Sequence, residues 1–319
     1  MPKLYPLIEA SGQHYLDGEN GHRIYFEEAG AQDGLPVVFL HGGPGSGCKP
    51  SHRQFFNPKK YRSVLVDQRG AGKSTPYGGV DSNTTQLLVS DLERIRTFLG
   101  IDRWVVFGGS WGAALALYYA INHPEVVSAL VLRGTFLARR YDVDWFFEHG
   151  ASRLLPLEWQ KFRTEVSKLQ QPGESILDCL YRGTFESDDA TRDRVAALWA
   201  NWSEAVVMYS FNTVPASDST ESTESMRAKT RIEMHYAKHN YFMPDAYLLD
   251  NATKIPDVPI KIIHGMRDIT CTPDAGWAIH QALPNSQFKL LRGAGHLSGE
   301  QAMTEALVEA ADSVVKELA

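Results

Sequence analysis

The sequence of 319 residues is poor in cysteine, and it has neither an excess of basic residues nor a long apolar run. Its three cysteines, Cys48, Cys179 and Cys271, are widely spaced and form no C-x-x-C pair, which predicts reduced thiols in the cytoplasm rather than a disulfide framework. A formal net charge of -6 argues against a nucleic-acid partner. Because no apolar stretch approaches the roughly 20 residues that span a bilayer, and the N-terminal segment does not resemble a signal peptide, no membrane partner is expected.

What the sequence does contain is an alternation of short apolar runs with helical patterns. Strands are expected at 23–28, 36–40, 62–67, 104–107, 128–132, 259–264 and 287–291, and helices at 84–99, 111–122 and 302–318. Strands that alternate with helices indicate a mostly parallel sheet covered on both faces. The sequence therefore predicts an α/β fold class.

The alternation is interrupted before the last two strands by a segment rich in Trp, Phe, Tyr, Glu and Arg with helical patterns. We expect a sheet domain of residues 1–136 and 252–319, with a helical cap of residues 137–251 inserted after the sixth core strand. Within the cap, the polar run at 216–225 is expected to form a mobile loop.

A serine nucleophile is predicted at Ser110, in the segment 108–112 that reads GGSWG. A G-x-S-x-G string alone arises by chance and can be a plain turn. Here it follows a predicted strand and precedes a predicted helix, as the nucleophile of the α/β-hydrolase fold does. Glycines on both sides let the backbone turn sharply, and the helix N-terminus places free N–H groups beside developing negative charge.

A serine hydroxyl needs a base and an orienting carboxylate, which in this fold follow it in the order Asp, His. Asp268 comes just after the strand predicted at 259–264, and His296 lies in a glycine-rich loop after the last predicted strand. The less favoured alternative for Asp268 is a helix cap or turn aspartate, and a histidine taken alone is more often structural than catalytic. Their positions after consecutive strands favour a Ser110–His296–Asp268 triad.

The negative charge that develops on the substrate carbonyl oxygen needs two backbone N–H donors. One is expected from Trp111, the residue after the nucleophile, and the other from Gly43 in the loop 41–45, which reads HGGPG. The alternative is a flexible turn, but three glycines beside a histidine exceed what a turn requires.

Two further motifs resemble binding sites. The segment 70–74, GAGKS, ends like a phosphate-binding loop, but Asp67 stands where that motif needs its first glycine. Glu233 and His235, with His239 nearby, lack the paired spacing of a zinc site. No metal or cofactor is therefore expected.

With these residues in place, the chain resembles the proline iminopeptidases, which are serine peptidases of the α/β-hydrolase fold. Four segments carry the resemblance: HGGPG at 41–45, DQRG at 67–70 with Gly72 and Ser74, GGSWG at 108–112 and LRG at 132–134. The resemblance implies an aminopeptidase that releases N-terminal proline from small peptides through an acyl-enzyme.

The resemblance also implies substrate-binding residues. Glu233, in a segment reading RIEMHY, matches one acidic site that binds the free amine in the family. Glu204 corresponds to the other only with a displacement of one residue, because Trp202 is followed by Ser203, and it could instead be a solvated helix-face carboxylate. Cys271 resembles a cysteine near the proline ring, or is a small buried thiol. Arg133 and Phe136 are further candidates for the pocket wall.

Two other functions remain open at this point. A carboxylesterase or other small acyl hydrolase would use the same triad, and the altered segment around Glu204 favours it. A binding protein that kept the fold and lost catalysis would be expected to lack a member of the triad, whereas Ser110, Asp268 and His296 are all present.

Overall fold

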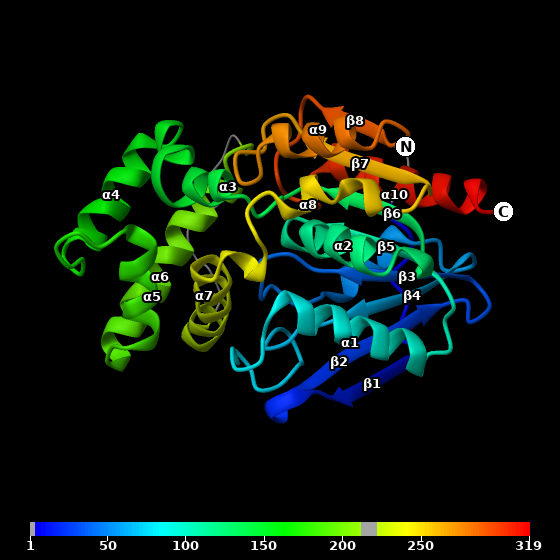
Figure 1. Ribbon diagram of the computed structural model, residues 1–319, viewed down its shortest axis with the longest axis horizontal. Coiled ribbons are helices and arrows are strands. Elements are labelled where there is room, and N and C mark those ends of the chain that lie inside the picture. Colours follow the sequence, from blue (N-terminus) through cyan, green and yellow to red (C-terminus); the bar gives the residue numbers. More distant parts are fainter. Residues whose placement is uncertain (1–3, 212–221) are drawn as a thin grey trace.

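The computed structural model describes residues 4–211 and 222–319, in which an eight-stranded sheet forms the centre (Figure 1). The strands are β1 (Gly12–Asp17), β2 (Arg23–Gly30), β3 (Leu35–Leu40), β4 (Tyr61–Val66), β5 (Trp104–Gly109), β6 (Val127–Arg133), β7 (Ile260–Gly265) and β8 (Gln287–Leu291). Their order is β1-β2-β4-β3-β5-β6-β7-β8. Pairing from β4 through β3 to β8 is parallel, and β2 runs antiparallel to both of its neighbours. The predicted mostly parallel sheet is thus confirmed.

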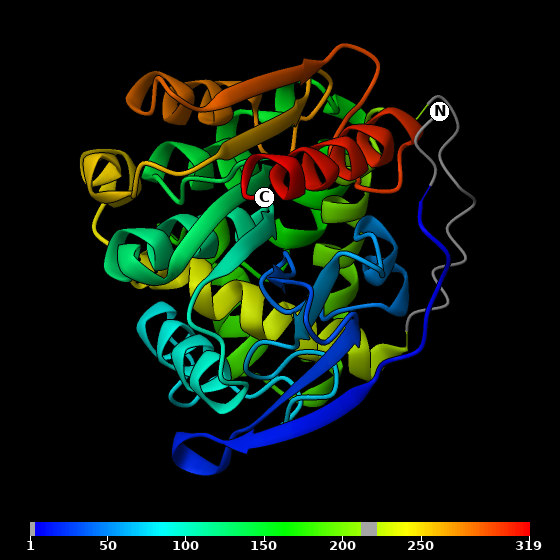
Figure 2. The same ribbon diagram turned by 90° about the vertical axis from the view of Figure 1, so that its right-hand side faces the viewer.

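Helices cover both faces of this sheet (Figure 2). On one face lie α1 (Thr85–Phe98), α2 (Trp111–Asn122), α8 (Tyr247–Asp250) and α9 (Pro273–Ala282), and on the other lies α10 (Gln301–Glu317). Every position of β5 is buried because its side chains meet a helix layer on each face. The short helical turns of the chain are η1 (Glu19–Gly21), η2 (Pro50–Phe55), η3 (Pro124–Val126), η4 (Trp145–His149), η5 (Ala151–Arg153), η6 (Asn240–Phe242) and η7 (Ala252–Lys254).

The strand β1 was not predicted. It is an edge strand that pairs only with β2 and buries none of its residues fully. A short edge strand of this kind carries little apolar signal, because only one of its faces contacts the protein.

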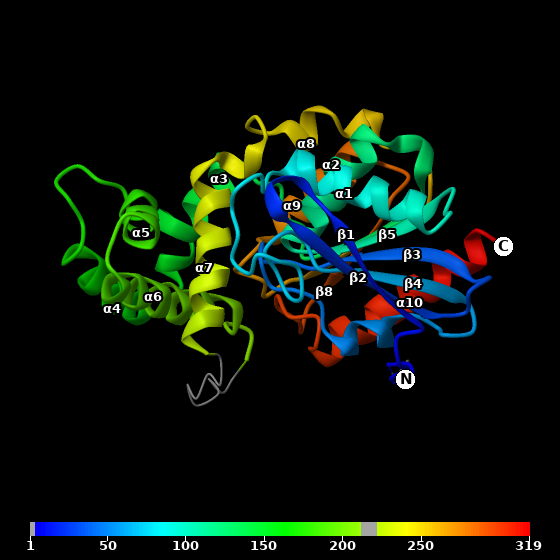
Figure 3. The same ribbon diagram turned by 90° about the horizontal axis from the view of Figure 1, so that it is seen from below.

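Apart from α8, which packs on the sheet, five helices of the described residues lie between β6 and β7, where the sequence predicted an insertion: α3 (Arg140–Asp144), α4 (Pro156–Ser167), α5 (Ile176–Phe185), α6 (Asp189–Val207) and α7 (Thr223–Lys238). Figures 1 and 3 show them beside the sheet, with α7 between α5 and α6 on one side and the sheet on the other. We call this group the cap. Its exact division from the sheet domain, at 136/137 and 251/252, stays a prediction.

Part of the polar run that was expected to form a loop is helical. Its residues 216–221 lie outside the described part of the chain. Ser222, however, is the N-cap of α7, and its side chain accepts a hydrogen bond from the backbone N–H of Ser225 (3.2 Å). The polar residues after Ser222 therefore form the first turn of a helix, where serine caps are favoured. The prediction of a loop was wrong for these positions.

Aromatic side chains form the centre of the cap. Trp202 is 2% exposed, stacks on Phe162 (ring centroids 5.6 Å apart) and packs against Trp159 (5.0 Å). Its indole N–H donates to the backbone oxygen of Phe146 (3.1 Å). Such aromatic pairs stabilise the packing of the cap helices beyond the apolar area that they bury.

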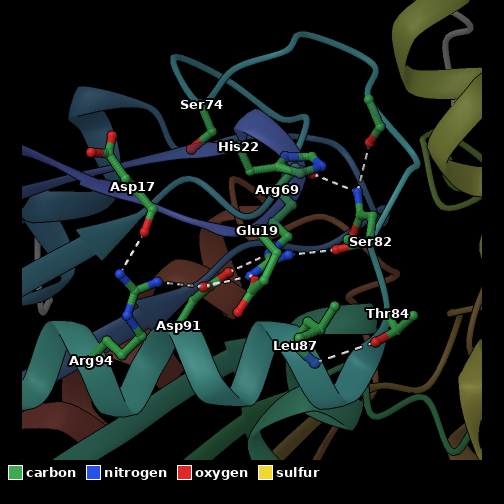
Figure 4. A network of polar contacts seen from close by, with 12 residues as sticks. Asp17, Glu19, His22, Arg69, Ser74, Ser82, Thr84, Leu87, Asp91 and Arg94 are labelled. Carbon is green, nitrogen blue, oxygen red and sulfur yellow. Dashed lines mark hydrogen bonds and ion pairs between the residues drawn. The ribbon is translucent and has the colours of Figure 1, made fainter.

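The loop after β4 is fixed by a buried arginine (Figure 4). Arg69 donates to both carboxylate oxygens of Asp91 on α1 (2.6 and 2.9 Å), to the backbone oxygen of Ser82 (2.5 Å) and to Glu19. Its side chain is fully buried, so these partners replace the water that the guanidinium loses.

None of the described helices has both the length and the apolar character that crossing a bilayer requires.

Candidate active site

The expected nucleophile, Ser110, lies at the turn between β5 and α2. Its backbone is in a strained conformation (φ 58°, ψ -124°). A methyl group at Gly108 would lie 2.1 Å from the carbonyl oxygen of Gly112, and one at Gly112 would lie 2.1 Å from that of Leu40. Side chains at either glycine would therefore force the turn apart, which explains why both flanking positions are glycine.

The expected base and acid are in direct contact. The Nδ1–H of His296 donates to Asp268 Oδ2 (2.8 Å), while Asp268 Oδ1 accepts from the backbone N–H groups of Thr270 (2.9 Å) and Cys271 (3.0 Å). Burial alone would raise the pKa of Asp268, but the interaction with His296 and the nearby His264 brings it below its ordinary value. The carboxylate is therefore ionised and accepts the Nδ1–H, which leaves Nε2 as the ring nitrogen that faces away from Asp268.

The contact between the expected nucleophile and the expected base is not formed among the described residues. Within the described part of the chain, no hydrogen bond joins Ser110 Oγ to His296; the hydroxyl lies 3.8 Å from Cys271 Sγ. The guanidinium of Arg133 contacts His296 instead. Its Nη1 lies 3.3 Å from His296 Nε2 and donates to the His296 carbonyl oxygen (2.9 Å). Burial lowers the pKa of Arg133, and no carboxylate of the described residues lies within 4 Å of it.

The two expected oxyanion donors belong to segments that adjoin Ser110. Trp111 is the first residue of α2, so its backbone N–H has no acceptor within the helix. Gly43 has φ +112°, which a residue with a side chain rarely adopts, and it is exposed. The loop of Gly43 approaches the nucleophile closely, since a methyl group at Gly42 would lie 3.1 Å from Ser110 Cβ.

A cavity of about 830 Å³ between the sheet and the cap collects the predicted residues. Every predicted site residue lines it except Asp268, which lies behind His296 and is 2% exposed. The predicted lining residues are Gly43, Ser110, Trp111, Arg133, Phe136, Glu204, Glu233, Cys271 and His296. The fold thus brings together residues that are up to 253 positions apart, from Gly43 to His296.

The two predicted carboxylates of the cap differ in their surroundings. Glu233 on α7 is half-buried, and its Oε2 accepts a hydrogen bond from the indole N–H of Trp199 on α6. Glu204 on α6 is exposed. Its neighbour Ser203, which stands at the position after Trp202, is half-buried and donates to the Ala200 carbonyl oxygen (3.1 Å). Glu233 is therefore the better placed carboxylate for a ligand inside the cavity.

Aromatic residues that were not predicted form much of the cavity wall. Phe147 stacks on Trp199 (4.6 Å), and Tyr241 meets Phe136 edge to face (4.9 Å). Burial, together with the charge of Glu233, raises the pKa of Tyr241, so its hydroxyl stays protonated. Phe146 and Asp142 also line the cavity, and Asp142 is paired with Arg139. Aromatic enrichment between β6 and β7 was visible in the sequence, but it does not reveal which rings face inward.

The motifs set aside in the sequence have structural contacts. Asp67 Oδ2 accepts from the backbone N–H of Lys73 (2.8 Å), and Ser74 Oγ donates to the Asp67 carbonyl oxygen (2.6 Å). The ring of His235 contacts the Asn83 carbonyl oxygen (2.9 Å) and so joins α7 to the sheet domain. In residues 4–211 and 222–319 there is no group of three or more His, Cys, Asp or Glu side chains that could hold a metal ion.

Comparison with known proteins identifies close relatives. The model of the α/β-hydrolase fold family matches residues 36–302. A proline iminopeptidase of Xylella fastidiosa is 41% identical over 317 residues, covering 99% of this chain and all of the relative. A proline iminopeptidase of Arabidopsis thaliana is 42% identical over 309 residues, covering 96% of this chain and 80% of the relative.

Solved structures with lower sequence identity share the fold. The crystal structure of VinJ superimposes with a TM-score of 0.66 at 21% identity, covering 98% of this chain and all of VinJ. The esterase RhEst1 of a Rhodococcus species superimposes with a TM-score of 0.59 at 18% identity, covering 96% of this chain and 99% of the esterase. At these identities the likeness defines the fold alone.

Proposed function

The chain belongs to the proline iminopeptidases of the α/β-hydrolase fold, and on that premise we propose that it releases N-terminal proline from small peptides. The observation that carries the proposal is the position of Glu233 in the same cavity as Ser110. An aminopeptidase must bind a charged amine at a fixed distance from the carbonyl it attacks, and a half-buried ammonium needs a carboxylate partner.

In the proposed first step, Ser110 Oγ attacks the carbonyl carbon of the N-terminal proline while His296 Nε2 takes the hydroxyl proton. Asp268 holds the ring through Nδ1 and stabilises its charged form. The carbonyl oxygen becomes an oxyanion that accepts from the backbone N–H groups of Gly43 and Trp111. No metal or cofactor enters this step.

Collapse of the tetrahedral intermediate breaks the C–N bond. His296 gives its proton to the leaving nitrogen, so the shortened peptide departs with a neutral amine and prolyl-Ser110 ester remains. Water then attacks the ester carbonyl as His296 takes one of its protons. The second collapse returns that proton to Ser110 Oγ and releases proline.

This mechanism requires a hydrogen bond from Ser110 Oγ to His296 Nε2. We infer that the serine side chain rotates away from Cys271 when substrate binds, and that the Arg133 guanidinium gives up its contact with Nε2. Catalytic hydrogen bonds commonly tighten only in the substrate complex. The bond from Arg133 to the His296 carbonyl oxygen can persist through this change.

Selection of proline is assigned to the carboxylates of the cap together with residues of the sheet domain that line the same cavity. Glu233, fixed by Trp199, binds the prolyl ammonium, and Glu204 contributes from its exposed position. The pyrrolidine ring packs among aromatic side chains such as Phe136, with Cys271 beside the nucleophile. A cavity closed by the cap admits small peptides.

A cytoplasmic location is part of the same proposal. It is supported by the three cysteines, all of which are free thiols. Recovery of the protein in a membrane or exported fraction after cell fractionation would contradict it.

The proposed activity is tested by comparing p-nitroanilides of proline and alanine, together with a p-nitrophenyl ester. We expect hydrolysis of the proline substrate to exceed that of alanine and to disappear in Ser110→Ala, and we expect a fluorophosphonate probe to label only the wild-type serine. Rapid ester hydrolysis without prolyl anilide hydrolysis would replace the proposal with a carboxylesterase. Absence of both activities and of labelling would indicate a protein without catalysis.

A further inference from the structure

The segment that follows β4 places three buried side chains beside the active-site loops. Asp67 accepts from the backbone N–H groups of Cys48 and Lys73, and Arg69 is held by Asp91. Between them, Gln68 is 4% exposed and points toward the loop that precedes Gly43. The proposed mechanism gives Gln68 no role, although its side-chain oxygen and nitrogen both form hydrogen bonds with the segments that carry the expected oxyanion donors.

Gln68 joins two chain segments that are separate in sequence. Its side-chain Nε2 donates to the backbone oxygen of His41 (2.8 Å), and its Oε1 accepts from the indole Nε1–H of Trp111 (2.8 Å). Because an indole nitrogen can only donate, the amide orientation is fixed. One buried side chain therefore connects the end of β3 with the start of α2.

The backbone of Gln68 makes a second connection through the ring of His41. The Gln68 N–H donates to His41 Nε2 (3.1 Å), so that nitrogen is the acceptor and Nδ1 carries the proton. The Nδ1–H then donates to the Gly42 carbonyl oxygen (2.9 Å). Burial lowers the pKa of His41, which keeps the ring neutral and this arrangement intact.

The carbonyl that His41 holds belongs to the peptide unit whose N–H is that of Gly43. Fixing the oxygen of a planar peptide also fixes the direction of its N–H. The other expected oxyanion donor is the backbone N–H of Trp111, whose side chain is tied to Gln68. Both donors are thus anchored to one residue.

We propose that Gln68 is a positioning residue for the oxyanion hole, acting on the Gly43 N–H through His41 and on the Trp111 N–H through the indole. The proposal rests on the serine acyl-transfer mechanism given above, but not on proline as the substrate. Gln68 touches no reacting atom. It acts by holding two donors at the separation that the oxyanion requires, and small displacements of such donors are costly to the rate.

The test is Gln68→Met, which keeps the length of the side chain and removes both of its hydrogen bonds. Because loss of one complete oxyanion donor lowers kcat by about 10²- to 10³-fold, we expect displaced donors to lower it by about 10- to 100-fold, with KM within about twofold. The decrease should occur with both prolyl p-nitroanilide and a p-nitrophenyl ester. A boronic acid analogue of proline, whose tetrahedral adduct uses the hole, should lose affinity in parallel, while inhibition by free proline stays unchanged.

The matched control is Ser74→Ala, since Ser74 is also buried, lies in the same loop and loses two hydrogen bonds, to Asp67 and from Tyr25. It should lower the melting temperature and leave kcat within about twofold. If Gln68→Met does not fold, Trp111→Phe removes the same indole bond and should lower kcat about three- to tenfold at unchanged KM.

Unchanged kcat in Gln68→Met, or equal losses in kcat and in free-proline affinity, would overturn the positioning role. A wild-type protein that hydrolyses the ester but not the anilide would contradict the proposed function alone. Inactivity of the wild type toward both substrates would overturn both.

Discussion

The sheet domain and the cap supply the site in different ways. In the sheet domain, each expected catalytic residue lies on a turn just after a strand, and its geometry is fixed by the backbone: Ser110 by flanking glycines, Asp268 by two N–H groups. In the cap, Glu233 is fixed by an indole from another helix. The residues proposed for the chemistry are thus held by local turns, whereas the carboxylate proposed for substrate selection is held by the packing of two helices.

The largest expected effect on activity comes from replacing the proposed nucleophile in the sheet domain. Ser110→Ala should lower kcat for prolyl p-nitroanilide by roughly 10⁴-fold or more, because the nucleophile and its base act as one unit. Inhibition by free proline should be unchanged, since the proposed amine site lies in the cap. Retention of more than about a hundredth of the wild-type kcat would mean that another group performs the attack.

A smaller loss is expected when the cap carboxylate is neutralised. Glu233→Gln keeps the acceptor for Trp199 and removes the charge, so kcat/KM should fall by about 30- to 1000-fold, the loss typical of an unpaired buried charge. Glu204→Gln is the matched control on α6. Because Glu204 is exposed, its effect should stay within about threefold. Larger losses from Glu204→Gln than from Glu233→Gln would reverse the assignment of the two carboxylates.

The contribution of Trp199 to holding Glu233 in place is tested by a substitution at Trp199. Trp199→Phe keeps an aromatic ring against Phe147 and removes the indole donor to Glu233. Hydrogen bonds to charged groups contribute about 1.5–3 kcal/mol, so kcat/KM should fall about tenfold, with most of the change in KM. An unchanged KM for prolyl p-nitroanilide would show that Glu233 needs no partner on α6.

The smallest expected effect is on the stability of the protein in acid, and it involves Asp268 in the sheet domain. The pKa of Asp268 is lower in the folded protein than its ordinary value of about 4, so its ionised form stabilises the fold above that pH. This contribution is lost as the pH falls below about 4 toward the folded-state pKa. Thermal unfolding between pH 6 and pH 3 should therefore show a steeper loss of melting temperature for the wild type than for Asp268→Asn. Parallel curves would mean that Asp268 contributes nothing to acid stability.

Elements of the sheet domain could be predicted from the sequence more fully than the contacts between helices of the cap. The strands, the turn at Ser110 and the loops carrying Asp268 and His296 could be predicted because glycines and apolar runs mark them locally. The edge strand β1 could not, since it buries little apolar surface. The aromatic wall that includes Phe147 and Tyr241 could not be predicted either, because ring orientation depends on contacts between helices that are far apart in sequence.

Contacts of single side chains were also beyond the sequence. Arg133 was expected in the pocket wall, and it lines the cavity, but its hydrogen bonds to His296 depend on a loop 163 residues away. Gln68 belonged to a recognised motif without any indication of what its amide would contact. Both cases show that a motif fixes the position of a residue more readily than the partners of its polar atoms.

The central claim is that a free prolyl amine, bound by Glu233, positions the substrate for Ser110. The most direct measurement is the ratio of kcat/KM for prolyl p-nitroanilide to that for its N-acetyl derivative, in the wild type and in Glu233→Gln. Because pairing with a buried carboxylate contributes several kcal/mol, we predict a ratio above about 100 in the wild type and a decrease of at least about tenfold in Glu233→Gln. Equal hydrolysis of the two substrates by the wild type, or the same ratio in both proteins, would contradict the account.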